Sequence, residues 1–329
     1  MRMAVDSMVM NMLDQIHALS LPDADRISFR DAIDIYQAFR PIMPSAISVC
    51  PQKKDRLVDI IPEIDALVLD GYGVINVGSG PIDGIDELFA VAASHDVPII
   101  VLTNGASFDT AKTWTKYDGW GLPIKPEQIV SSRDAMLAHI CPSDDVSGAY
   151  ANLGSFSATS LPIGVDGERR PDQDDDFYEQ TEHFVFLGSV DWAESDQQRL
   201  ETAFLDGDRQ LHIANPDVVS PHEHALNAEP GYWAARLIQR TGTVPKWYGK
   251  PHAPAFRQAL DRLQLLYGRN IDPGKVAMVG DSLHTDIIGA GAMGMRSVLL
   301  TDYGLFRDGG AMMAIDQCAI YPDWIVSKL

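Results

Sequence analysis

Asp70 is the residue with the clearest chemical potential in this chain. It follows the apolar run 66–69 and opens the segment Asp-Gly-Tyr-Gly, which puts a carboxylate on a sharp turn after a predicted buried strand. Such a carboxylate can attack phosphorus and form an aspartyl-phosphate that water hydrolyses, and its second oxygen can hold a divalent cation. Aspartate before glycine is also a common turn pair, so Asp70 alone supports either interpretation.

A second pair of carboxylates follows another apolar run. Asp281 comes directly after the run 276–279 and Gly280, and Asp286 lies at the start of a predicted helix. Clustered carboxylates repel one another unless a cation lies between them. Asp70, Asp281 and Asp286 together therefore favour a hard divalent ion, for which Mg²⁺ is the first choice. Asp286 has an alternative role, which is to cap the helix or to orient its neighbours through hydrogen bonds.

Two further segments carry groups that suit a phosphoryl oxygen. Thr103, Asn104 and Gly105 follow the run 97–102 and offer a hydroxyl, an amide and backbone N–H groups, which is the chemistry of phosphate sites near helix amino termini. Lys250 stands between a glycine and a proline and provides a point charge that can neutralise a nucleophile and a phosphate together. Alone, each segment is equally consistent with an ordinary turn or a surface lysine. Only their combination indicates a site.

The elements that position these residues are predicted from four short apolar runs, each followed by polar residues. Helical stretches separate the runs, which is the pattern of parallel strands joined by crossover helices. The sequence therefore predicts an α/β fold with a Rossmann-like parallel sheet, and ligands bind such sheets beyond the carboxyl ends of the strands. Polar residues far apart in the chain are expected to converge there. The runs are 66–69, 97–102, 276–279 and 297–300.

The chain is long enough for more than one domain. Its 329 residues exceed the roughly 250 to 300 at which a single core stops growing. Residues 1–54 have apolar side chains at helical spacing and are predicted to form a helical extension. We expect it to pack against the core or a second subunit, which allows a homodimer, and nothing in it indicates chemistry. The core is predicted over 55–107 and 245–329, with an inserted α/β cap over 108–244.

Charge and cysteine content limit the partners and the compartment. A formal net charge of −20 argues against binding of nucleic acid or of an anionic membrane, which needs clustered Lys and Arg. Three scattered cysteines indicate neither a disulfide framework nor a zinc site, and the first residues lack the pattern of a signal peptide. No apolar run approaches the roughly 20 residues that span a bilayer. We therefore expect a cytoplasmic protein.

Taken in order, these segments resemble the four motifs of the haloacid dehalogenase-like (HAD) hydrolase superfamily. The resemblance covers about residues 55–301. No single motif identifies the superfamily, but four motifs in this order are highly specific for it. The asparagine of the second motif, the large insertion and Asn215-Pro216-Asp217 are similar to the branch of sugar-phosphate, phosphoglycolate and nitrophenyl phosphatases with a large α/β cap. The motifs are Asp70 with Gly73-Val74, Thr103-Asn104, Gly249-Lys250-Pro251, and Gly280-Asp281-Ser282 with Thr285-Asp286.

The resemblance implies a magnesium-dependent hydrolase that acts on a small phosphorylated metabolite. Asp70 would be the nucleophile, Thr103 with Asn104 and Gly105 would bind the phosphoryl group, and Lys250 would stabilise charge.

The remaining implied roles concern the metal and the cap. Magnesium would be held by Asp70, the backbone carbonyl of Tyr72 and Asp281, with Asp286 nearby. Asn215 lies near the return from the cap to the core and is a candidate substrate contact, although Asn-Pro-Asp is also a natural turn.

Tyr72 is the departure from the family pattern. Phosphatases of the family have an aspartate at this position, which protonates the leaving group and then activates water. A general acid contributes roughly 10² to 10⁴-fold, and a phenol with an ordinary pKa of about 10 is a weak replacement near neutral pH. As a catalytic residue, Tyr72 would therefore permit only slow turnover of poor leaving groups.

This departure leaves two alternatives to a slow phosphatase. One is a catalytically weak relative that binds a phosphorylated ligand as a sensor or partner protein. The other is a carbon-centred hydrolase, because haloacid dehalogenases of the same superfamily also have tyrosine here. Asp281 and Asp286 and the large cap weigh against the dehalogenase, since those enzymes need no magnesium and usually have a smaller helical cap.

Overall fold

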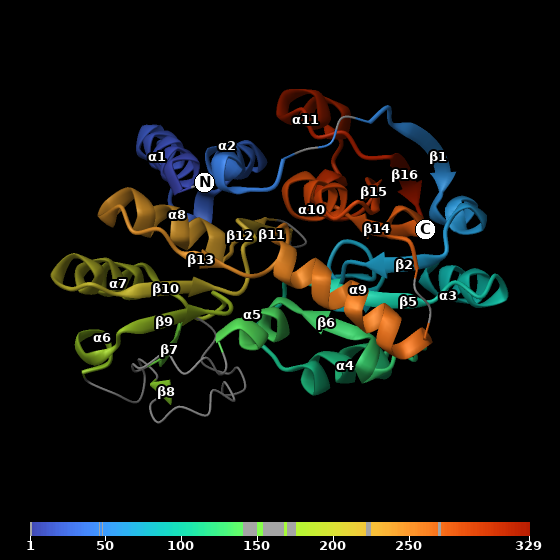
Figure 1. The fold of residues 1–329 in the computed structure, drawn as a ribbon, viewed down its shortest axis with the longest axis horizontal. Coiled ribbons are helices and arrows are strands. Elements are labelled where there is room, and N and C mark those ends of the chain that lie inside the picture. The colour runs from blue at the N-terminus through green and yellow to red at the C-terminus, as the bar shows by residue number, and fades with distance from the viewer. Residues whose placement is uncertain are drawn as a thin grey trace.

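The computed structural model describes residues 2–45, 47, 49–140, 150–153, 168–169, 176–221, 225–268 and 271–329. Two sheets lie side by side along the long axis of the molecule, and two N-terminal helices lie next to the smaller one (Figure 1). The predicted α/β fold with a Rossmann-like parallel sheet is confirmed. In the described part of the chain, no helix combines the length and the apolar character needed to cross a bilayer.

The larger sheet is the core. Its described residues form seven parallel strands in the order β1-β16-β15-β14-β2-β5-β6. Every residue of the central strands β2 and β14 is buried, as expected for a parallel sheet with helices on both faces. The strands are β1 (Gln52–Arg56), β2 (Ala66–Leu69), β5 (Ile99–Thr103), β6 (Ile129–Ser131), β14 (Val276–Gly280), β15 (Arg296–Leu300) and β16 (Trp324–Lys328).

Helices cover both faces of this sheet. They are α3 (Ile85–Ser94), α4 (Thr110–Gly119), α5 (Ser132–Ile140), α9 (Ala253–Tyr267), α10 (Ile288–Ala292) and α11 (Ala311–Cys318). Alternation along β2 sends its side chains to two separate apolar clusters. Leu67 and Leu69 pack with α3 and α4, whereas Ala66 and Val68 pack with α5, α9 and α10.

The smaller sheet belongs to the inserted cap. It is also parallel, in the order β13-β10-β9-β7-β8. Helices α6 (Phe177–Gln180), α7 (Glu194–Asp206) and α8 (Pro230–Thr241) share its apolar cluster. Its strands are β7 (Tyr150–Leu153), β8 (Glu168–Arg169), β9 (His183–Phe186), β10 (Gln210–Ile213) and β13 (Lys246–Trp247).

Two short antiparallel hairpins follow residues of interest. The hairpin of β3 (Asn76–Val77) and β4 (Gly80–Pro81) comes directly after the segment that begins at Asp70. The hairpin of β11 (Val219–Pro221) and β12 (Leu226–Ala228) follows Asn215-Pro216-Asp217 in the cap.

The predicted domain boundaries need correction. β6 pairs with β5, with Ile129 opposite Val101, so the insertion predicted to start at residue 108 begins too early and the smaller sheet starts only at β7. The strand and helix pattern is the same on both sides of that boundary, which hides it from the sequence. The core also starts before residue 55, because β1 pairs with β16 from Gln52 onward. β1 is a charged edge strand and needs no apolar run.

The N-terminal extension consists of α1 (Arg2–Ala18) and α2 (Phe29–Phe39). Ser28 begins α2 with a capping box, in which its hydroxyl accepts a hydrogen bond from the Asp31 N–H. The sequence predicts packing against the core or a second subunit. In the structure, Phe29 and Ile33 of α2 pack against the core as predicted. The extension also shares its main apolar cluster with the cap, including Phe184 and Tyr232, and both of its helices lie beside α8 (Figure 1).

Gly231 provides a test of how α8 packs. A Cβ at this position would lie 2.6 Å from the carbonyl oxygen of Asp217. We expect Gly231→Ala to lower the free energy of unfolding by about 1 to 3 kcal/mol through overpacking, as measured by urea denaturation. Gly119→Ala in α4 is the control, because a Cβ there meets nothing within 4 Å and alanine favours a helix by up to about 1 kcal/mol. Equal losses in both variants would contradict the packing.

Candidate active site

Three adjacent strands bring candidate residues to one edge of the core sheet. β14, β2 and β5 are neighbours, and Asp281, Asp70 and Thr103 stand at their carboxyl ends. Leu69, the last residue of β2, pairs with Val279, and the Asp70 N–H continues the ladder by donating to the Val279 carbonyl at 2.9 Å. The predicted convergence beyond the strand ends is therefore present.

Lys250 joins two of the carboxylates. Its Nζ lies 2.6 Å from Oδ1 of Asp70 and 2.7 Å from Oδ1 of Asp286, and its side chain is only 1% exposed. Burial disfavours the charged lysine, but Asp286 and Asp70, followed by Asp217, outweigh burial and hold the pKa of Lys250 above its ordinary value. Oδ2 of Asp286 accepts a hydrogen bond from the Ser282 N–H at 3.1 Å. Asp286 thus makes the orienting hydrogen bonds predicted as its alternative role, and it also lies close to the other two carboxylates.

Asp70, Asp281 and Asp286 form this acidic cluster, with one oxygen of each within 4.8 Å of the others. Burial, then the charges of Asp70 and Asp286, raise the pKa of Asp281 well above its ordinary value. Burial likewise raises the pKa of Asp70 to about 7, against the lowering effect of Lys250. Three buried carboxylates around one ammonium leave an excess of negative charge. A set of oxygen donors this close together fits a hard divalent cation.

Two glycines allow the backbone to close around Asp281. A Cβ at Gly73 or Gly304 would overlap the Asp281 carboxylate, and these glycines have φ angles of 83° and 62°. The Leu305 N–H donates to Oδ2 of Asp281 at 2.9 Å. Any larger residue at either glycine would displace the carboxylate and would strain the backbone.

The side-chain amide of Asn104 forms hydrogen bonds to Lys250 and Asp217. Its Oδ1 accepts a hydrogen bond from the Lys250 N–H at 2.8 Å, and its Nδ2 donates to the Lys250 carbonyl at 3.1 Å and to Oδ1 of Asp217 at 2.8 Å. The side chain predicted to contact phosphate therefore holds Lys250 in place. Thr103 lines the cavity beside it and accepts a hydrogen bond on Oγ1 from the Gly105 N–H at 3.1 Å.

Tyr72 borders the same cavity. Its hydroxyl oxygen accepts a hydrogen bond at 3.0 Å from the N–H of Gly78, which lies between β3 and β4. The hairpin that follows the Asp70 segment thus fixes the position of this phenol.

Asn215 and Asp217 form the turn considered for them and also line the cavity. Oδ1 of Asn215 accepts a hydrogen bond from the Asp217 N–H at 3.0 Å, and its Nδ2 donates to Oε2 of Glu229 at 3.1 Å. Burial is the main cause that raises the pKa values of Asp217 and Glu229 to about 7. Sequence reasoning missed Glu229, because no motif marks it.

Tyr36 is a further residue that sequence reasoning missed, and it comes from the extension. It lines the cavity and is 2% exposed. Its ring stacks on His284, with centroids 4.9 Å apart and an interplanar angle of 4°. Its oxygen accepts a hydrogen bond from the Val218 N–H at 3.0 Å. The only sequence signal was its place on the apolar face of α2, which indicates burial and not a site.

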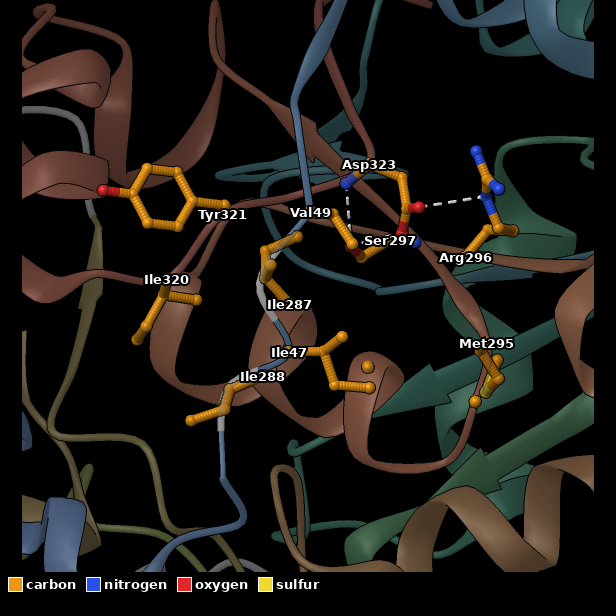
Figure 2. A pocket seen from close by; sticks show the side chains of 12 residues that line it. Ile47, Val49, Ile287, Ile288, Met295, Arg296, Ser297, Ile320, Tyr321 and Asp323 are labelled. Atoms are coloured by element: carbon orange, nitrogen blue, oxygen red, sulfur yellow. Dashed lines mark hydrogen bonds and ion pairs between the residues drawn. The ribbon is translucent and has the colours of Figure 1, made fainter.

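The resulting cavity measures about 580 Å³ and is lined by residues of the core, the cap and the extension. A smaller cavity of about 190 Å³ lies under the linker that follows the extension. Figure 2 shows that isoleucine side chains, among them Ile47 and Ile288, border this second cavity, with the Arg296–Asp323 ion pair to one side. Its described lining contains no acidic cluster of the kind found around Asp70.

Two family models match separate parts of the chain. A model for haloacid dehalogenase-like hydrolases matches residues 67–154, and a HAD-hydrolase-like model matches residues 247–327. The first range contains Asp70 and Thr103, and the second contains Lys250. The chain belongs to the haloacid dehalogenase-like hydrolases.

Known proteins extend the likeness of this HAD-like hydrolase into the cap. The acid sugar phosphatase of Staphylococcus haemolyticus is 25% identical over 234 residues, which are 70% of this chain and 82% of the relative. A possible sugar phosphatase of the HAD superfamily from Cytophaga hutchinsonii superposes with a TM-score of 0.73 and 24% identity, over 84% of this chain and 98% of that one. A glycerol phosphate phosphatase from Mycobacterium tuberculosis, in complex with calcium, has a TM-score of 0.57 and 25% identity, over 73% and 67% of the two chains.

The buried Glu229 makes the stability of this hydrolase depend on pH. Its pKa of about 7 in the folded state lies above the unfolded value of about 4.3. The folded protein therefore keeps a proton that the unfolded chain loses, and stability falls as pH rises through this range. Between pH 4.5 and 7.5, the raised pKa of Glu229 lowers the free energy of unfolding by at most about 3 kcal/mol. We therefore expect the thermal midpoint of Glu229→Gln to fall less steeply over this pH range than that of the wild type.

The measurement is calorimetric unfolding at a series of pH values. Glu87→Gln is the control. Hydrogen bonding to Arg56 lowers the pKa of Glu87, so removing this carboxylate does not reduce the loss of stability as pH rises. An unchanged slope in Glu229→Gln would show that Glu229 is already ionised at low pH.

Proposed function

We propose that this HAD-like hydrolase is a magnesium-dependent phosphatase that acts on a small phosphorylated metabolite through an aspartyl-phosphate. The observation that carries the proposal is the buried Lys250 ammonium between Asp70 and Asp286, within a cluster completed by Asp281. The relatives named acid sugar phosphatase and glycerol phosphate phosphatase support a phosphate monoester as the substrate. The calcium in the latter structure supports a divalent cation.

Asp70 is the proposed nucleophile. The Gly71 N–H and Lys250 both contact Oδ1, which leaves Oδ2 to attack phosphorus. A bond forms from Oδ2 to phosphorus, the ester P–O bond breaks, and the alcohol oxygen leaves with its electron pair. Water then attacks the phosphorus of the aspartyl-phosphate, which releases inorganic phosphate and restores Asp70.

The surrounding residues bind and neutralise the phosphoryl group. Lys250 offsets the charge of the nucleophile and of the phosphoryl oxygens, and the Thr103 hydroxyl offers a donor at the same edge of the sheet. The Gly105 N–H, which donates to Oγ1 of Thr103, orients this hydroxyl. Asp70, Asp281 and the backbone carbonyl of Tyr72 would hold magnesium, with Asp286 beside it. When bound, the ion would neutralise negative charge on the phosphoryl group and the carboxylates.

Tyr72 is expected to restrict fast hydrolysis to esters with good leaving groups. A leaving alkoxide needs a proton, and a phenol delivers one poorly near neutral pH. Activated esters are therefore expected to react faster than alkyl phosphates. The same residue favours a second candidate function, a weakly catalytic protein that binds a phosphorylated ligand as a sensor. The retained acidic cluster argues against a dehalogenase, which has no use for a divalent cation.

The first test is p-nitrophenyl phosphate hydrolysis with magnesium or with chelator. We expect the wild type to release phosphate only with the metal and Asp70→Asn to be inactive. We expect Tyr72→Asp to accelerate hydrolysis of an alkyl ester such as glycerol phosphate by about 10² or more, because it restores an acid and base. Tyr72→Phe is the matched control and should bring no gain. Phosphate binding without turnover in the wild type would favour the sensor, and halide release without metal would favour the dehalogenase.

A second test concerns the metal. In chelator, Asp281→Asn should raise the thermal midpoint by at least about 2 °C, because one of three mutually repelling carboxylates is neutralised. Added Mg²⁺ should stabilise the wild type more than the variant, because the variant has lost a ligand. Asp302→Asn, at an exposed aspartate after β15, is the control and should respond to magnesium like the wild type. A variant that gains as much as the wild type from magnesium would exclude Asp281 as a ligand.

A further inference from the structure

We propose that Tyr36, on the N-terminal extension, is a ligand-binding residue of the active site and donates its hydroxyl proton in a hydrogen bond to an oxygen of the bound phosphoryl group. The extension is then a third component of the site, together with the core and the cap. The nature of the ligand rests on the proposed function. The residue that binds it follows from the contacts of Tyr36.

The hydroxyl of Tyr36 has an unused donor, and Tyr36 lines the cavity. A phenol offers one O–H donor and an acceptor oxygen, and the Val218 N–H uses the acceptor. Among the described residues, Tyr36 makes no other hydrogen bond, although its side chain is 2% exposed and lines the cavity with Asp70. A buried donor without an acceptor is unfavourable, so an oxygen of a bound ligand is the natural partner.

Tyr36 borders the same cavity as Asp70, Thr103 and Asp281, the residues proposed to surround the phosphoryl group. Burial, followed by the charge of Asp217 and the smaller effects of Asp281 and Asp286, holds the pKa of its phenol well above the ordinary value. Tyr36 therefore stays a neutral donor at any physiological pH. A neutral donor next to an acidic cluster suits a phosphoryl oxygen, because this oxygen is the acceptor that Lys250 and a divalent cation bring there.

Tyr36 is held by both the core and the cap. Its ring stacks on His284 of the core, while its oxygen contacts the backbone of Val218 in the cap. Two neighbours on α2 strengthen the contact with the core: Phe29 packs edge-on against Phe306, with centroids 5.4 Å apart, and Ile33 shares an apolar cluster with η6 (Leu283–Ile287) and α11. The phenol is therefore fixed in position before a ligand arrives.

The extension is also anchored to the cap at a distance from the cavity. The Tyr232 hydroxyl donates to the Pro22 carbonyl at 2.5 Å, and Nε2 of Gln239 donates to the carbonyls of Ile16 and Leu19, each at 2.9 Å. The family-model matches begin at residue 67, so these contacts belong to a part of the chain outside the matched hydrolase segments. Tyr36 is thus a site residue that the family pattern does not supply.

The test compares Tyr36→Phe with Tyr232→Phe. Each variant removes one buried hydroxyl that joins the extension to the cap, but only Tyr36 lines the cavity. The probe is inorganic phosphate in the presence of Mg²⁺, with affinity measured by calorimetry on the full chain. We expect Tyr36→Phe to weaken phosphate binding about tenfold or more, as for loss of a hydrogen bond to a charged group, and Tyr232→Phe to bind like the wild type.

The outcomes separate this inference from the proposed function. Unchanged phosphate affinity in Tyr36→Phe, an equal loss in Tyr232→Phe, or no phosphate binding by the wild type would each overturn the role of Tyr36. A wild type that binds phosphate but hydrolyses no ester would overturn the phosphatase proposal. The phosphate affinities of the two variants would then still decide the role of Tyr36. Thermal unfolding of both variants checks the fold, and the stacking on His284 is retained in Tyr36→Phe because the ring remains.

Discussion

The buried Lys250 ammonium, held between Asp70 and Asp286, is the interaction on which the rest of the site depends. Removing charges from water costs several kcal/mol per ion, and only well-placed partners offset that cost. The neighbouring segments provide that placement. Asn104 binds both the N–H and the carbonyl of Lys250, and Gly249 permits a close approach, since a Cβ there would lie 2.5 Å from the Ala214 carbonyl oxygen. One ammonium does not balance the three carboxylates, so the site also fits a divalent cation.

The same network couples the cap and the extension to Asp70. Asp217 of the cap hydrogen-bonds to Asn104, which holds Lys250, which contacts Asp70. Tyr36 adds a link from the cap backbone to the core. A movement of the cap would therefore change the contacts of Lys250, which binds Asp70. Closure of the cap over a substrate would in this way alter the surroundings of Asp70.

The edge of the sheet that carries the candidate residues was predictable because its signals are local. An apolar run followed by a polar residue identifies a strand end, and the parallel-sheet rule states that such ends meet. Asp70, Thr103 and Asp281 were located in this way. The boundary at residue 108 failed because β6 has the same pattern whichever sheet it joins. The role of Asn104 was predicted only in part: the amide that suits a phosphate also suits the backbone of Lys250, and sequence does not choose between them.

The sequence by itself determined the fold class, the order of the motifs and the residues able to do chemistry, since these depend on residue type and on spacing along the chain. Tertiary structure alone decided which groups meet. The apolar face of α2 predicts burial but not the surface that buries it, so the position of Tyr36 beside His284 and Val218 was not predictable. The contact of Glu229 with Asn215 is likewise absent from any local pattern. Such contacts depend on how separate elements pack, and helix periodicity contains no information about the partner.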